Sequence, residues 1–180
     1  ELSYLNKGIS ITVEDRRGEE AKKEAFHAEG GLSSYVRYLN EYKTVLSDPI
    51  SLEGEGTTEK NGAGDPVSVE VAIQYNDKFD EKVVTFVNNI NTREGGTHLS
   101  GFKAALSRCF NNQLKNSQKY MKIYSGSLDG KDIAEGLTAV ISVKIPNPQF
   151  EGQTKMKLGN SSVKGIVDSL VYEKLTNFFD

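Results

Sequence analysis

The chain has 180 residues, of which 37% are hydrophobic and 26% are charged, and its formal net charge at pH 7 is −3. This composition is typical of a folded, soluble domain and argues against a disordered chain. No apolar run is long enough to span a bilayer, so we expect no association with a membrane. The negative charge argues against a protein that binds nucleic acid over its whole surface, although it is compatible with a local basic patch.

Cysteine usage indicates a reducing compartment. The single cysteine, Cys109, excludes an internal disulfide and a cysteine-based zinc site. No secretory signal is recognisable in the sequence. We therefore expect a cytoplasmic protein.

The first third of the chain is predicted to contain a hairpin, a helix and an edge strand. Apolar and polar residues alternate over 9–15, and a second short strand over 23–28 follows a charged turn, which together indicate a β-hairpin. Residues 32–42 have apolar side chains at helical spacing. Residues 50–56 are a candidate edge strand, and residues 57–66 have the composition of a turn region.

The middle of the chain holds the best strand and the clearest helix. Residues 67–75 alternate with a strict period of two, and residues 81–89 are expected to pair with them as the second strand of a hairpin. The pattern over 90–116 predicts a helix, with Thr97 as its N-cap after a Gly-Gly turn.

The last third is predicted to form a buried strand and an amphipathic helix. Residues 136–145 are mostly apolar, and two prolines close this strand. Apolar side chains at helical spacing over 163–175 predict the final helix. Strands outnumber helices and occur mostly as hairpins, so the sequence predicts an α+β domain with helices on one face of a sheet.

Few residues have the pattern of a catalytic or metal site. His27 and His98 have no carboxylate at metal-ligand spacing, and the place of His98 in the first turn of a helix favours a structural or solvated role. Cys109 lies on the apolar stripe of its helix, which favours packing over nucleophilic chemistry. The glycine-rich residues 53–65 lack the Gly-Lys-Ser/Thr ending of a phosphate-binding loop. We therefore expect no metal site and no complete active site.

The stretch FEGQTKMKLGN (150–160) connects the last predicted strand to the last predicted helix. On the residues alone, a solvated loop is the favoured interpretation. The more specific alternative is a phosphate site, because lysine ammonium groups and the amide of Gln153 are suitable donors for phosphate oxygens. A nucleotide pocket and metal ligands would also be required and neither is recognisable, so most of such a site would come from another domain.

Five segments of the chain together resemble the DNA gyrase B family. They are residues 5–17, 26–31, 69–77, 88–108 and 135–160. They follow in the family's order, cover essentially the whole chain, and include the long and specific motifs REGGTHLSGFK and FEGQTKMKLGN. The homologous protein of topoisomerase IV shares most of these motifs and is the close alternative.

The resemblance implies that residues 1–180 form a single transducer domain, the second domain of the ATPase region of gyrase B. The expected fold is that of the second domain of ribosomal protein S5, a mixed β-sheet with helices packed on one face and a left-handed βαβ crossover. In the parent protein, an ATP-binding domain would precede these residues and a cleavage domain would follow them. The isolated fragment is then expected to be inactive.

The resemblance also implies roles for individual residues. Gln153 and Lys155 are expected to contact the γ-phosphate of an ATP molecule held by the neighbouring domain. Thr154, Lys157 and Gly152 are expected to support this loop. Without nucleotide, the loop is expected to be mobile or displaced.

Two positions depart from the family's pattern. Lys103 stands where an arginine typically faces the DNA cavity, so the charge is kept but the planar fork of donors is lost. Ala134 stands where many members have arginine, and no lost contact can be named for it.

Cofactors and partners are implied in the same way. The full-length protein would bind ATP and Mg²⁺, mainly through the preceding domain, and would associate with itself on ATP binding. It would join DNA gyrase A in an A2B2 heterotetramer that passes double-stranded DNA and introduces negative supercoils in the bacterial cytoplasm. A stand-alone S5-like module that binds nucleic acid is the less favoured alternative.

Overall fold

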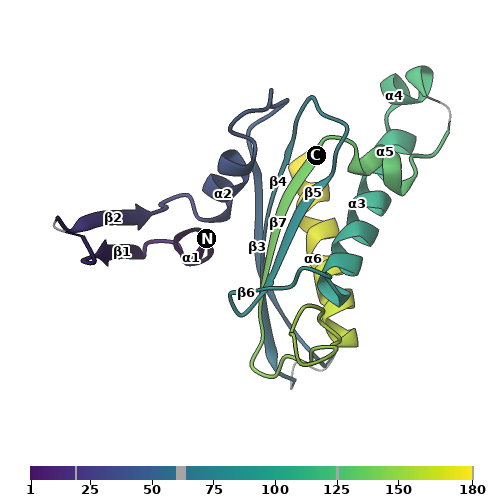
Figure 1. Ribbon diagram of the computed structural model, residues 1–180. Helices are drawn as coiled ribbons and strands as arrows, with labels where there is room; N and C mark the ends of the chain where they lie inside the picture. Colours follow the sequence, from purple (N-terminus) through teal and green to yellow (C-terminus); the bar gives the residue numbers. More distant parts are fainter. Residues whose placement is uncertain (19, 60–63, 125, 180) are drawn as a thin grey trace.

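A five-stranded sheet with helices on both faces forms the body of the protein, and a separate two-stranded hairpin projects from it (Figure 1). The computed structural model describes residues 1–18, 20–59, 64–124 and 126–179. The strands are β1 (Ser10–Asp15), β2 (Lys22–His27), β3 (Ile50–Thr57), β4 (Pro66–Tyr75), β5 (Lys82–Val87), β6 (Ile90–Asn91) and β7 (Leu137–Lys144). The helices are α1 (Leu2–Leu5), α2 (Leu32–Leu39), α3 (Thr97–Asn116), α4 (Gln118–Ile123), α5 (Gly130–Ala134) and α6 (Ser161–Phe179).

The predicted hairpin of β1 and β2 is confirmed, with Ser10 opposite His27 and Asp15 opposite Lys22. The predicted turn over 57–66 is described in part, because residues 60–63 lie outside the described residues. The polar connection after α3, for which no element was predicted, contains α4 and α5. Within the described residues, no helix is both long and apolar enough to cross a membrane.

The strand order in the main sheet is β3-β4-β7-β5-β6, and this order corrects one prediction. The strands over 67–75 and 81–89 do not form a hairpin. Instead β4 pairs antiparallel with β3 and with β7, whereas β5 runs parallel to β7. Seven of the eight residues of β7 are buried, and a strand that is apolar on both faces takes the centre of a sheet. Period-two alternation identifies a strand but does not identify its partner.

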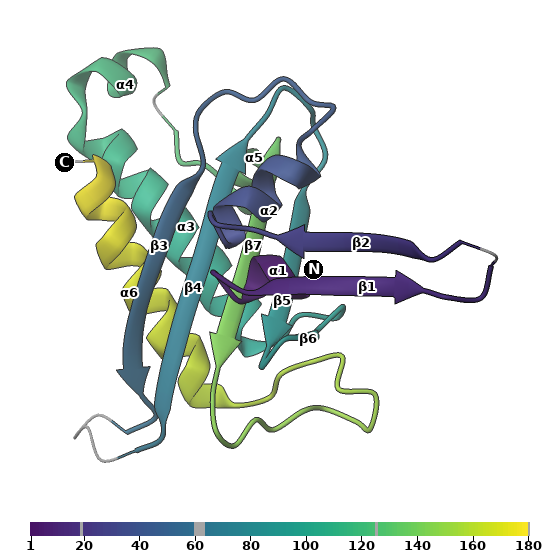
Figure 2. The same cartoon turned by 90° about the vertical axis from the view of Figure 1, so that its left-hand side faces the viewer.

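The connection from β5 through α3 to β7 is a left-handed crossover. In Figure 2 both strands run downward, α3 lies behind the sheet, and β7 lies to the left of β5. This hand departs from the usual right-handed rule and agrees with the predicted fold.

The two long helices, α3 and α6, cover one face of the sheet and bury the main core with it. Their buried side chains include Phe102, Leu106 and Val167, and Cys109 packs there as predicted. The short helix α2 lies on the opposite face, over a smaller apolar cluster (Figure 1). The α+β class with a mixed sheet is therefore confirmed, and the one-face arrangement holds for the two long helices.

A buried polar network joins the end of α2 to the sheet. Asn40 follows the last residue of α2, and its amide donates to Gln74 Oε1 at 2.9 Å. Its carbonyl oxygen accepts from Thr138 Oγ1 at 2.7 Å and from Asn76 Nδ2 at 3.3 Å. Because buried amides are costly when unpaired, this network fixes where α2 ends on the sheet.

The start of α3 also differs from the prediction. Gly96, with φ of 130°, is the N-cap, and Thr97 is the first helical residue. The hydroxyl of Thr97 is buried and makes no hydrogen bond with the described residues, so it does not cap the helix. Residues 90–96, which belong to the predicted helical stretch 90–116 but precede its predicted N-cap, form β6 and a turn.

Candidate functional site

The connection between β7 and α6 is the candidate site, and it lies at the end of the sheet opposite α4 (Figures 1 and 2). Its tip consists of Gly152, Gln153, Thr154 and Lys155, all of which are exposed. Gly152 has φ of 80° and Lys155 has φ of 54°, so two left-handed residues turn the chain at the tip. This turn presents the side chains between them to solvent.

Below the tip, the two arms of the loop are joined to each other. The backbone N–H of Glu151 donates to Lys157 O at 2.9 Å, and that of Gly159 donates to Gln149 O at 2.7 Å. The side chains of Glu151 and Lys157 form an ion pair at 2.8 Å. Residues 149–151 and 157–159 thus form a hydrogen-bonded stalk, and this stalk carries the exposed tip.

The charges of the stalk and the tip differ in their pairing. The hydrogen bond with Glu151, and then its charge, raise the pKa of Lys157, so this lysine is charged but locally neutralised. Neither Gln153 nor Lys155 makes a hydrogen bond or ion pair with any residue that the structure describes. An unpaired ammonium and an unpaired amide on one exposed turn are suited to bind an anion such as a terminal phosphate.

The structure does not bring Lys103 to this loop. Lys103 lies on α3 and forms an ion pair with Glu81 at 2.8 Å, and both side chains are partly exposed. Its charge is therefore compensated within the domain. Ala134 is the last residue of α5, and nothing in the structure explains the departure from arginine there.

The two histidines lie in different environments. His98 is fully buried, its Nε2 lies 3.1 Å from Thr92 Oγ1, and burial lowers its pKa to about 4, so the ring is neutral. His27 is exposed beside Ser10 on the hairpin. No group of three or more potential metal ligands occurs among the described residues.

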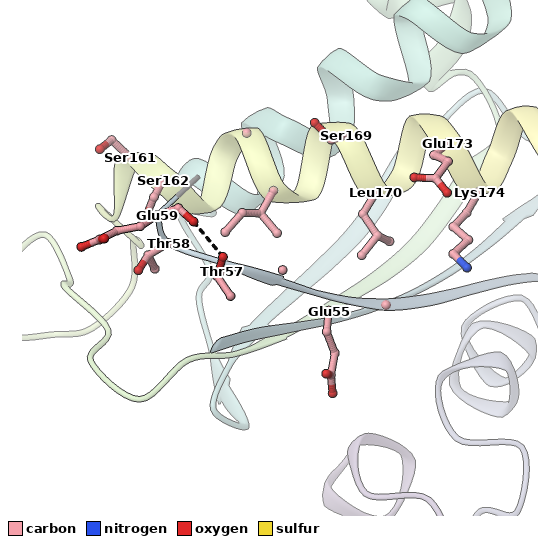
Figure 3. Close-up of a pocket in the computed structure, with 14 residues that line it drawn as sticks. Glu55, Thr57, Thr58, Glu59, Ser161, Ser162, Ser169, Leu170, Glu173 and Lys174 are labelled. Atoms are coloured by element: carbon pink, nitrogen blue, oxygen red, sulfur yellow. Dashed lines mark hydrogen bonds between the residues drawn. The ribbon is translucent and has the colours of Figure 1, made fainter. Parts of the chain in front are cut away.

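A hollow with a volume of about 780 Å³ lies between β3 and α6 (Figure 3). Small residues and hydroxyl groups line much of it, and the hydroxyl of Thr57 already donates to Glu59 O at 2.8 Å. A side chain at Gly54 or Gly56 would approach α6 within 2.6 Å. These short distances are to the side chains of Leu170 and Ile166, and the small residues beside them leave the hollow open.

Two features of the site were missed in the sequence. The partner of Lys157 is Glu151, which the sequence places in the same stretch, but the pairing depends on a turn that brings position 151 opposite position 157. The glycines before α3 were interpreted as a turn alone. In the structure the loop returns against them, with Gly96 and Leu158 bridged.

Comparison with known families and proteins gives consistent matches. The family model described as DNA gyrase B matches residues 31–180. DNA gyrase B of Treponema denticola is 54% identical over 183 residues, which cover 100% of this chain and 27% of that protein. DNA gyrase B of Clostridium acetobutylicum is 51% identical over 181 residues, again 100% of this chain and 27% of that protein. The chain thus spans about a quarter of the length of these relatives.

Solved structures give the same picture. The 43K ATPase domain of Thermus thermophilus gyrase B, in complex with an aminocoumarin, is 35% identical with a TM-score of 0.81, covering 99% of this chain and 45% of that chain. A topoisomerase IV ATP-binding domain from Francisella tularensis shares the fold, with a TM-score of 0.74, 24% identity, and coverage of 98% of this chain and 44% of that chain.

Proposed function

The chain belongs to the DNA gyrase B family, and on that premise we propose that residues 1–180 are the transducer domain of a type II DNA topoisomerase. The domain couples ATP binding and hydrolysis in an adjacent domain to DNA strand passage and negative supercoiling. The exposed tip of the loop is the observation that supports this role. Gln153 and Lys155 have no hydrogen-bond or ion-pair partner among the described residues, so both are available to bind a phosphate.

In this proposal the tip senses the γ-phosphate of ATP. Lys155 supplies a point charge and Gln153 a neutral donor, while Gly152, Thr154 and Lys157 shape the turn and the stalk. The phosphate is present before hydrolysis and leaves afterwards, so the loop has two states that can bias the orientation of one domain against another.

In this proposal the ATP site and the other components of the topoisomerase lie outside these residues, and ATP and Mg²⁺ are held mainly by the preceding domain. The partners are DNA gyrase A in an A2B2 heterotetramer, double-stranded DNA and, on ATP binding, a second copy of the full-length protein. We place this complex in the bacterial cytoplasm. Lys103 faces the DNA cavity, with a phosphate competing against Glu81 for its ammonium group.

Two alternatives are less well supported. The curated relatives described above are gyrase proteins, so the topoisomerase IV assignment is not favoured. A stand-alone module that binds nucleic acid is opposed by the net charge of −3. That module would show salt-dependent DNA affinity for the 180 residues alone, and a filter-binding titration at low salt tests for it.

The substitution Lys155→Ala in the full-length protein, assembled with DNA gyrase A, tests the proposal. A hydrogen bond from a charged group contributes about 1.5–3 kcal/mol, so ATP turnover should fall about ten- to hundredfold. Supercoiling should fall with it, while the circular dichroism spectrum stays unchanged because the side chain is exposed.

Lys131→Ala is the matched control. Lys131 is exposed on α5, at the other end of the sheet, and forms no ion pair with the described residues. Its variant should keep wild-type turnover and supercoiling. Wild-type turnover in Lys155→Ala would refute the sensor role, and equal losses in both variants would point to a general charge effect.

A further inference from the structure

The loop that carries Lys155 is hydrogen-bonded to the start of α3 through residues 156–158, the return arm of the loop. Glu94 N–H donates to Met156 O, Leu158 N–H to Gly95 O, and Thr97 N–H to Leu158 O, each at 3.0 Å. The carbonyl of Leu158 thereby satisfies one of the free N–H groups of the helix start, which have no partner within the helix.

Gly96 permits this attachment. A Cβ atom at position 96 would lie 2.3 Å from Leu158 O and 2.5 Å from Leu158 N, and both are backbone atoms of the return arm. Gly96 also has φ of 130°, a backbone conformation that residues with a Cβ atom rarely adopt. Any larger residue would therefore push the arm away from the helix.

The return arm cannot shift easily to relieve such a contact. The side chain of Leu158 is fully buried in the main core. The outgoing arm is held to the return arm by the hydrogen bonds and the ion pair of the stalk. A displacement at position 158 must therefore move the whole stalk together with its tip.

We infer that Gly96 is a positioning residue for the phosphate-sensing tip, which it serves by locking the stalk to α3. The inference rests on the proposed function, since it concerns how Lys155 meets the nucleotide. It also names the route by which the tip acts on the domain. A displacement of Lys155 on phosphate binding is transmitted through Leu158 to α3. Helix α3 in turn lies so close to α6 that a Cβ atom at Gly101 would be 2.4 Å from Lys164 O.

Gly96→Ala and Gly95→Ala, made in the full-length protein with DNA gyrase A, form a matched pair. Both glycines have positive φ, but a Cβ at Gly95 would meet only the flexible side chain of Leu99, at 2.5 Å. A displacement of about 1 Å can cost up to a hundredfold in a positioned reaction, so Gly96→Ala should lower ATP turnover about tenfold or more. Gly95→Ala should stay within about threefold of the wild type, because it adds the backbone strain without moving the loop.

Two further measurements separate positioning from a general structural defect. In hydrogen exchange, the amides of Leu158 and Thr97 should lose protection in Gly96→Ala and keep it in Gly95→Ala. The double variant Gly96→Ala/Lys155→Ala should be no slower than Lys155→Ala alone, because both changes remove the same contact. Additive losses, or a Gly96→Ala variant that behaves like Gly95→Ala, would overturn the inference.

Thr97→Pro keeps the test decisive if Gly96→Ala does not fold. Proline is well tolerated at the first position of a helix, and the hydroxyl that is lost has no hydrogen-bond partner among the described residues. The change removes the N–H from which Leu158 O accepts a hydrogen bond, so ATP turnover should fall as in Gly96→Ala. Wild-type turnover in Thr97→Pro overturns the inference, whereas wild-type turnover in Lys155→Ala overturns the proposed function together with it.

Discussion

Gly101→Ala should destabilise the protein, although alanine favours a helix more strongly than glycine does. Gly101 lies inside α3, where replacement by alanine would ordinarily stabilise by about 1 kcal/mol. The structure opposes this gain. A Cβ atom at position 101 would lie 2.4 Å from Lys164 O and 3.2 Å from Asp168 N, so it would meet the backbone of α6.

The magnitude follows from these two opposed effects. Overpacking costs about 1–3 kcal/mol, and contact with a rigid backbone at the most extensive helix–helix interface belongs at the upper end. Subtracting the helix-propensity gain leaves a net loss of about 2 kcal/mol. For a chain of this size, that loss corresponds to a fall in Tm of about 4–8 °C.

Gly165→Ala is the matched control, because Gly165 lies inside α6 and a Cβ atom there would meet nothing within 4 Å. Only the helix-propensity gain remains, so Tm should rise by about 2–4 °C. Thermal unfolding of the 180-residue chain, followed by circular dichroism, measures both variants. A Gly101→Ala variant at least as stable as the wild type would show that α3 and α6 are not in backbone contact.

Two further predictions concern buried polar groups. Asn40→Ala removes three buried side-chain hydrogen bonds and should lower the free energy of unfolding by about 3 kcal/mol in urea denaturation, whereas Asn112→Ala, which loses one, should cost about 1 kcal/mol. Because the pKa of His98 is lowered to about 4 in the folded state, the unfolded chain binds the proton first, and stability should fall by about 3 kcal/mol as the pH falls from 6.5 to 4. His98→Gln should remove most of this pH dependence of stability, and an unchanged pH dependence in that variant would contradict the assignment. For the asparagines, equal losses of unfolding free energy in the two variants would contradict the role given to Asn40.

Several elements could be predicted because their signals are local. Apolar residues at helical spacing identified α3 and α6, and strict alternation identified β4, since each pattern reflects the one face that an element buries. The packing role of Cys109 followed from its place on such a stripe. The loop over 150–160 could be recognised because its polar residues have no place in a core.

Strand partners and helix termini could not be predicted in this way. The neighbours of β5 depend on a crossover that returns the chain to the sheet beyond α3, and no local pattern encodes that return. Thr97 has the residue type of an N-cap, but it is the first helical residue, and its own N–H donates to the carbonyl of Leu158 from a distant part of the chain. Local propensity was overruled where a tertiary contact satisfied a backbone N–H at the helix start.

The family, the α+β class and the candidate residues for a phosphate contact could be inferred from the sequence alone, because motifs and apolar periods are properties of neighbouring positions. The tertiary structure decided which of these residues are available. It pairs Lys157 with Glu151, pairs Lys103 with Glu81, and leaves Lys155 without a partner among the described residues. It also decided where the loop is anchored, since the contact of Gly96 with Leu158 exists only after the chain has closed on itself. Coulombic pairing and close backbone approach act through distances in space, and folding sets those distances.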